Sequence, residues 1–142
     1  MGNLIFGCDI CQEVCPWNSK ATPSLEKGFQ PRKGNFLPKL TSLMNMTQEE
    51  FNRRFKESPV KRSKRRGFLR NVAVALGNSK DKSAVTVLGK ALNDSEPLVR
   101  GHAAWGLGQI GGDDATQALK ERLEVEENPE IIDELEFAIN SI

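Results

Sequence analysis

Three cysteines near the start of the chain have a spacing that suits metal chemistry. They are Cys8, Cys11 and Cys15, and Pro16 follows the last of them, so the spacing is C-x2-C-x3-C-P. This is the final part of the bacterial ferredoxin motif C-x2-C-x2-C-x3-C-P, in which the cysteine before the proline ligates a different iron–sulfur cluster from its neighbours. On this pattern Cys8 and Cys11 are predicted to serve one cluster and Cys15 a second.

Two other interpretations of the cysteines stay open. A zinc site usually takes four ligands, as two C-x2-C pairs or with histidines. The only histidine, His102, falls in a stretch predicted to be helical. The three thiols could also be unligated in a loop. The C-x3-C-P spacing fits neither alternative well and favours the iron–sulfur interpretation.

The composition is that of a globular protein with one sizeable core, since 38% of its 142 residues are hydrophobic and 27% are charged. No apolar run approaches the roughly 18 residues that a membrane span needs. The first residues lack the basic and apolar regions of a secretory signal. A small, odd and clustered set of cysteines is typical of a reducing compartment. We therefore expect a cytoplasmic protein.

Prolines and glycines recur throughout the first 45 residues and interrupt any helical pattern there. The pattern changes at Thr47, because Thr47 and Glu50 form the sequence signature of a capping box. We expect a helix that begins there and continues to about Glu57, before Pro59. The chain is accordingly divided into an irregular cysteine-bearing segment, residues 1–45, and a helical domain, residues 46–142.

The second half of the chain repeats itself at an offset of about 30 residues. Residues 68–94 and 98–124 share an arginine, an Ala-rich apolar face and a Leu-Gly pair, and residues 129–142 form a third, partial copy. Each copy is predicted to be a helix–turn–helix unit that buries its apolar face only by stacking on its neighbours. The predicted fold class is all-α, a solenoid that resembles short HEAT repeats.

Individual residues of these repeats have predicted roles. Gly77 and Gly108 suit the position that follows a helix, and Pro97 and Pro129 suit the first turn of one. The remaining candidates are a packing or hydrogen-bonding role for His102, a wedge between repeats for Trp105, a cover over a cluster or a small core for Trp17, and a solvated helix end for Glu124, Glu126, Glu127 and Glu130.

A strongly basic stretch precedes the first repeat. Residues 1–80 hold 15 Lys and Arg against 6 Asp and Glu, whereas residues 81–142 hold 5 against 13. Such a cluster favours contact with a polyanion through counterion release, although it is also compatible with a solvated linker. Arg100 is included because it is predicted to match Arg70 in the next repeat. The candidate nucleic-acid contacts are Arg53, Arg54, Lys61, Arg62, Lys64, Arg65, Arg66, Arg70 and Arg100.

Three stretches carry a resemblance to a known family. GNLIFGCDICQEVCPWN, SPVKRSKRRGFLRNVAVALGN and VRGHAAWGLG, in this order, closely resemble the C-terminal portion of epoxyqueuosine reductases. This resemblance implies an enzyme that uses cobalamin and two 4Fe-4S clusters to reduce epoxyqueuosine in tRNA. It implies that Cys8 and Cys11 help to hold the second cluster, that Cys15 completes the first, and that the other ligands lie in an upstream part of the same protein.

The resemblance does not extend to the corrinoid-binding region, the acid that assists epoxide opening or the first cluster motif of the family. We therefore predict no catalytic residue in this chain and no activity of the chain alone. The basic stretch is expected to contact tRNA, and the open ends of the solenoid could self-associate. The alternative function is a non-enzymatic HEAT-like module that binds a protein partner, with vestigial or zinc-bound cysteines.

Overall fold

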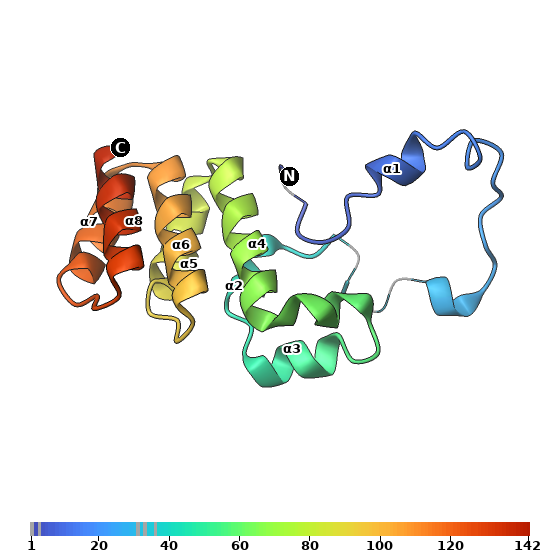
Figure 1. Cartoon of the computed structure of the whole chain (residues 1–142), viewed down its shortest axis with the longest axis horizontal. Helices are drawn as coiled ribbons and strands as arrows, with labels where there is room; N and C mark the ends of the chain where they lie inside the picture. Colours follow the sequence, from blue (N-terminus) through green and yellow to red (C-terminus); the bar gives the residue numbers. More distant parts are fainter. Residues whose placement is uncertain (1, 3, 31, 33, 36) are drawn as a thin grey trace.

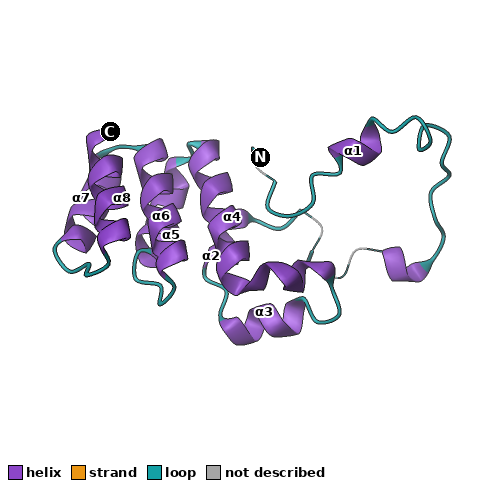
Figure 2. Ribbon diagram, in the orientation of Figure 1, coloured by secondary structure: helices purple, strands orange, loops and turns teal. Residues whose placement is uncertain are grey.

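The computed structural model describes residues 2, 4–30, 32, 34–35 and 37–142. Within these residues all regular structure is helical and no strand is present, as Figure 2 shows. The predicted all-α fold is therefore confirmed. No helix in the described part of the chain is long and apolar enough to cross a membrane.

The repeats form two layers of helices. Helices α4, α6 and α8 lie side by side in one layer, and α5 and α7 lie behind them (Figure 1). Each pair α4–α5 and α6–α7 is one helix–turn–helix unit, and α8 begins a third. The bounds are α4 (Lys64–Ser79), α5 (Val85–Ala91), α6 (Pro97–Ile110), α7 (Asp113–Leu123) and α8 (Pro129–Asn140).

The preceding residues are less regular, as predicted. Two short helices, α1 (Ile10–Glu13) and the 3-10 helix η1 (Lys27–Phe29), lie in a long loop that projects from the helical body (Figure 1). Three elements then lead into the repeats: α2 (Leu40–Met44), α3 (Gln48–Arg54) and the 3-10 helix η2 (Pro59–Ser63). Because α2 buries Leu43 and Met44 in the core, the packed helical region begins at Leu40.

One continuous core runs through the repeats. Each helix from α4 to α8 contributes at least one fully buried leucine to it: Leu69, Leu88, Leu107, Leu119 and Leu135. Burying a side chain of this size stabilises the fold by about 1.5–3 kcal/mol relative to leaving it exposed. Since α4 packs on α6 and α6 on α8, the core is shared between successive units.

The capping box of α3 is present as predicted. The Glu50 backbone N–H donates to the Thr47 side chain at 3.1 Å, and the Thr47 backbone N–H donates to the Glu50 carboxylate at 2.9 Å. The helix ends at Arg54 and not at about Glu57, so the predicted length is wrong. Phe55 turns into the core against Phe51 and Phe68, with ring centroids 5.1 Å and 5.0 Å away. That packing favours an early end to the helix.

The predicted roles of Gly77 and Gly108 are also wrong, because both glycines lie inside helices. Helix α4 ends at Ser79 and α6 at Ile110, and the residues with positive φ that follow them are Lys80 at 53° and Gly111 at 69°. A Cβ on Gly77 would lie 2.8 Å from the Cα of Gly106 in α6, and one on Gly108 would lie 3.1 Å from Ala138 in α8. These glycines allow the helices of the α4–α6–α8 layer to approach closely.

Other local predictions for the repeats are confirmed. Pro97 and Pro129 occupy the first turns of α6 and α8. Trp105 packs between the repeats, since a Cβ on Gly77 would lie 2.8 Å from its indole ring. The Nδ1 atom of His102 lies 3.0 Å from the Leu98 carbonyl oxygen, one turn earlier in the same helix.

Candidate nucleic-acid interface

Five of the predicted nucleic-acid contacts are exposed and lie on consecutive elements. They run from the last turn of α3, through η2, to the first turn of α4. The side chains of four of them donate no hydrogen bond to any residue that the structure describes, and the Arg66 guanidinium only approaches Glu96 at 3.9 Å. We call this set the basic surface: Arg53, Lys61, Arg62, Lys64 and Arg66.

The N-terminus of α4 adds to the positive potential of the basic surface. No side chain within the described residues caps this helix. The Ser63 hydroxyl, which could have done so, donates to the Val60 carbonyl oxygen at 2.7 Å instead. Uncapped N–H groups and the helix dipole favour an anion at such a position. The basic surface is therefore suited to phosphate groups.

Arg54 has a structural role at the edge of this region. Its Nε donates to Asn35 Oδ1 at 2.8 Å, and its Nη2 donates to the Gly34 carbonyl oxygen. Its guanidinium also lies 5.8 Å from the centroid of the Phe55 ring. Arg54 thus ties residues 34–35 to the end of α3 and is separate from the basic surface.

Arg65 points into the fold, away from solvent. Its Nη1 donates to Asp94 Oδ1 at 3.1 Å, its Nη2 donates to Asp94 Oδ2, and its Nε donates to the Met46 carbonyl oxygen at 2.8 Å. Burial raises the pKa of Asp94, but hydrogen bonds from Arg65 and from the Glu96 backbone outweigh it and leave this pKa below its usual value. Arg65 therefore links α4 to the loop before α6.

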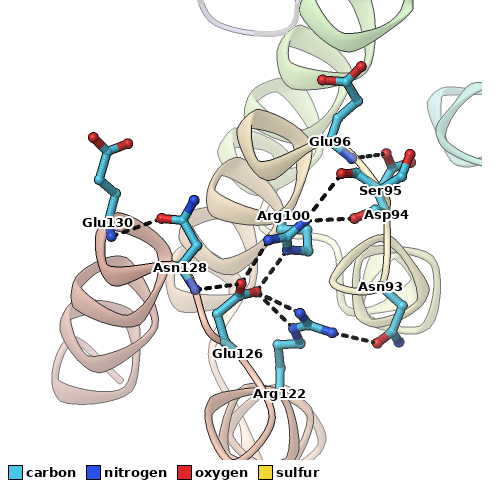
Figure 3. A network of polar contacts seen from close by, with 9 residues as sticks. All are labelled: Asn93, Asp94, Ser95, Glu96, Arg100, Arg122, Glu126, Asn128 and Glu130. Carbon is cyan, nitrogen blue, oxygen red and sulfur yellow. Dashed lines mark hydrogen bonds and ion pairs between the residues drawn. The ribbon is translucent and has the colours of Figure 1, made fainter.

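Arg100 makes the same kind of link one repeat later (Figure 3). Its Nε and Nη2 donate to the two carboxylate oxygens of Glu126 at 2.8 Å and 2.7 Å, and its Nη1 donates to the Asp94 carbonyl oxygen at 3.0 Å. Arg122 donates to Glu126 from the other side, at 2.7 Å and 3.0 Å. The predicted exposure of Glu126 is wrong, because its side chain is only 2% exposed.

Hydrogen bonds from Arg100 are the largest cause of a low pKa at Glu126, which falls to about 2 even though burial opposes the shift. Hydrogen bonds from Arg122 and from the Asn128 backbone N–H lower it further. The Glu126 carboxylate is thus held ionised between two guanidinium groups and the start of α8.

The acids of the two buried pairs occupy equivalent positions, and we call each pair an arginine–acid clamp. Asp94 and Glu126 both stand three residues before the proline that begins the next helix. Arg65 therefore holds Asp94 as Arg100 holds Glu126, although Arg70 was the residue predicted to match Arg100. Arg70 donates instead to the neighbouring Asn71 side chain at 2.9 Å and 3.0 Å. The repeated acid-x-x-Pro pattern is the signal from which these clamps could have been found.

The cysteines lie in the projecting loop, apart from the repeats. Cys8 and Cys11 are exposed, Cys15 is half-buried, and all three are free thiols. Across the described residues no three His, Cys, Asp or Glu side chains are grouped so as to hold a metal. A 4Fe-4S cluster takes four cysteine thiolates, and this sequence has three cysteines. Trp17 is 92% exposed and so covers no core among the described residues.

Two asparagines that the sequence did not single out attach the start of the cysteine-bearing segment to α4. The side-chain amide of Asn71 donates to the Ile5 carbonyl oxygen at 2.8 Å, and that of Asn78 donates to the Gly2 carbonyl oxygen at 2.9 Å. Asn71 is itself almost fully buried. The path of the chain toward Cys8 thus begins on the same helix that carries part of the basic surface.

Known proteins resemble this chain both in its helical repeats and over most of its length. Residues 62–140 match the family model for HEAT repeats. An epoxyqueuosine reductase of Xanthomonas campestris pv. campestris is 40% identical over 112 residues, which are 78% of this chain and 32% of that protein. The epoxyqueuosine reductase of Bacillus cereus is 32% identical over 136 residues, which are 95% of this chain and 36% of that protein.

The fold agrees with these relatives. The crystal structure of an epoxyqueuosine reductase with an epoxyqueuosine-modified tRNA-Tyr stem loop superimposes with a TM-score of 0.90 and 33% identity. The match covers 99% of this chain and 38% of that one. The chain spans about a third of the length of these curated relatives. Since the family match covers more than half of the chain, the chain belongs to the HEAT-repeat family, and in sequence and fold it is homologous to part of the epoxyqueuosine reductases.

Proposed function

We propose that this chain is the C-terminal part of an epoxyqueuosine reductase and that its basic surface binds the tRNA substrate. The observation that carries this proposal is the fold match to a reductase that was crystallised with a modified tRNA stem loop. The exposed cations at the start of the repeats support this proposal, because Lys and Arg side chains neutralise the phosphates of an RNA backbone.

The basic surface would bind RNA through its phosphates and not through its bases. Five cations beside an uncapped helix N-terminus offer charge but little base-specific geometry. Recognition would therefore rest on the shape of the RNA and its backbone, and it would weaken steeply with salt. Arg54, Arg65, Arg70 and Arg100 would hold the surface in place, since their guanidinium groups already have partners within the chain.

The cysteines would be partial ligand sets in the complete protein. We assign residues 1–45 to the end of a ferredoxin-like domain and residues 46–142 to the HEAT-like domain. In this assignment Cys8 and Cys11 serve one 4Fe-4S cluster and Cys15 another, and further cysteines of the whole protein complete both. The exposure of Cys8 and Cys11 supports sharing, because these two thiols remain accessible to a ligand set outside this chain. Cobalamin and the reduction of the epoxide belong to the remainder of such a protein.

Substituting Arg53, Lys61 and Arg62 by alanine tests the RNA-binding proposal. We expect this triple variant to bind an epoxyqueuosine tRNA stem loop about tenfold to a hundredfold more weakly at ~0.1 M salt. The slope of log K against log salt should also become less steep by about 2. Affinity is measured by fluorescence anisotropy across a salt series.

The matched control replaces Lys82, Lys90 and Lys120, which are exposed residues of the second half, by alanine. Both triple variants lose the same charge, so only a local contact distinguishes them. If the control weakens stem-loop binding as much as the first variant does, the basic surface has no special role and the proposal fails.

The assignment of the cysteines is tested by anaerobic reconstitution of the chain with iron and sulfide. We expect the chain alone to retain no more iron than a variant with serine at Cys8, Cys11 and Cys15, and to reduce no epoxyqueuosine when cobalamin and a reductant are supplied. Iron and sulfide analysis, a visible spectrum and nucleoside analysis of the tRNA are the measurements. A stable cysteine-dependent cluster, or turnover by the chain alone, would contradict the shared-ligand assignment.

A further inference from the structure

A cavity of about 410 Å³ opens between α4, α6 and α8, and neither the basic surface nor the cysteines contribute to its lining. Helix α6 contributes His102 and Trp105 to it, and α8 contributes Glu130 and Glu134. The remaining walls are apolar, with Leu98 and Ile131 among them. None of the roles assigned above uses this cavity.

The indole of Trp105 gives the cavity an aromatic wall in a fixed place. Its benzene ring packs against the backbone of α4 at Gly77, where a Cβ would lie only 2.8 Å away. An indole is the best aromatic partner for a cation that lies over its face. The wall therefore suits a flat or compact cationic group with an aliphatic stem.

The polar groups of the cavity mainly accept hydrogen bonds. The Nδ1 atom of His102 lies 3.0 Å from the Leu98 carbonyl oxygen, and a hydrogen bond between them requires the tautomer with its proton on Nδ1. In the neutral ring Nε2 is then an acceptor. Glu134 Oε1 is shielded from solvent and has no hydrogen-bond partner among the described residues. Glu130 adds a second carboxylate, at an exposed position.

The charges of the cavity identify the class of group that fits it. Two carboxylates and no Lys or Arg among its lining residues exclude phosphate and RNA as occupants. A guanidinium group has five donors and no acceptor, stacks flat on an aromatic ring, and matches a carboxylate with two parallel hydrogen bonds. A primary ammonium group lacks this planar geometry.

We propose that this cavity binds the guanidinium group of an arginine side chain from a partner protein. The guanidinium lies on the indole of Trp105 and donates to Glu134, which supplies the donor that the enclosed carboxylate oxygen lacks. Leu98 and Ile131 pack against the aliphatic part of the arginine. This inference is independent of the proposed action on tRNA, since it uses no residue of the basic surface.

The test uses the full chain with Trp17→Phe, so that Trp105 is the only tryptophan and reports on the cavity. N-acetyl-arginine amide is titrated against it, with N-acetyl-citrulline amide as the uncharged analogue of the same shape. We expect a saturable change in Trp105 fluorescence with the arginine compound, and affinity at least tenfold weaker with the citrulline compound. The lysine compound is expected to bind more weakly than the arginine compound.

Two carboxylate variants test whether Glu134 binds the arginine compound. Glu134→Gln should weaken binding of N-acetyl-arginine amide at least tenfold, whereas Glu124→Gln, an exposed residue that does not line the cavity, should leave it unchanged. Circular dichroism and the NMR signals of the His102 ring establish that both variants keep the fold. Equal binding of citrulline or lysine, an equal effect of the two variants, or the absence of saturable binding would overturn the proposal.

Discussion

Replacing Glu126 by alanine is expected to lower the free energy of unfolding of the chain by about 3 kcal/mol at pH 7. The change leaves the guanidinium groups of Arg100 and Arg122 side by side without their shared carboxylate. Breaking a buried ion pair costs about 3–5 kcal/mol, and the lower end applies because the two arginines remain 11% and 18% exposed. Urea titration followed by circular dichroism measures the loss.

The loss should depend on pH in a direction that the pKa of Glu126 fixes. This pKa is lowered from 4.5 to about 2 in the folded chain, so the ionised carboxylate stabilises the fold fully above about pH 4.5. As the pH falls toward 2, the carboxylate is protonated in the folded state as well and this contribution disappears. The difference in unfolding free energy between the natural chain and the alanine variant should therefore shrink between pH 4.5 and pH 2.

A nearby glutamate provides the control for this prediction. Glu124 is exposed, and Glu124→Ala is expected to change the unfolding free energy by less than about 0.5 kcal/mol at either pH. If the Glu126 and Glu124 variants behave alike, Glu126 does not bind the two arginines as tightly as the structure shows.

Gly77→Ala is expected to destabilise the chain by about 2 kcal/mol, which is opposite to the usual effect of this substitution within a helix. Alanine normally stabilises a helix interior by roughly 0.5–1 kcal/mol relative to glycine. At Gly77, however, the added methyl group would lie 2.8 Å from both the Gly106 backbone and the Trp105 ring. Helices α4 and α6 must then move apart along their contact.

Gly89→Ala is the matched control for the crowding at Gly77. Gly89 lies in α5, and a Cβ there would meet only the Ala118 side chain at an ordinary contact distance of 3.7 Å. This variant should gain roughly 0.5–1 kcal/mol in unfolding free energy. Thermal unfolding of both variants gives the comparison, and a stabilised Gly77 variant would show that the two helices are free to separate.

The features that the sequence predicted correctly depend on nearby residues. The capping box of Thr47 and Glu50, and the first-turn positions of Pro97 and Pro129, follow from backbone chemistry within one helical turn. The stacking of repeats followed from periodicity, because an apolar face that recurs every 30 residues must be buried by its neighbours.

The features that the sequence misjudged depend on contacts between repeats. Arg65 and Arg100 cannot be told from the exposed arginines by residue type. They are largely buried because each pairs with an acid that lies 29 or 26 residues later in the sequence. Gly77 was predicted to follow a helix end, because the sequence around it does not show that Gly106 of α6, 29 residues later, lies against it. The sequence therefore does not reveal which of these cations are exposed and which are bound within the fold.

The attachment of residues 2 and 5 to α4 fixes the distance between the basic surface and the start of the cysteine-bearing segment. Arg66 in the first turn and Asn78 near the end of α4 are separated by about 18 Å along the helix axis, at 1.5 Å per residue. Adding one residue to α4 between them would lengthen this spacing by only about 1.5 Å but would rotate Asn78 by about 100°. The length of helix α4 therefore determines both the distance and the relative rotation between the two parts. This helix therefore cannot change in length without changing the direction in which the cysteine-bearing segment leaves it.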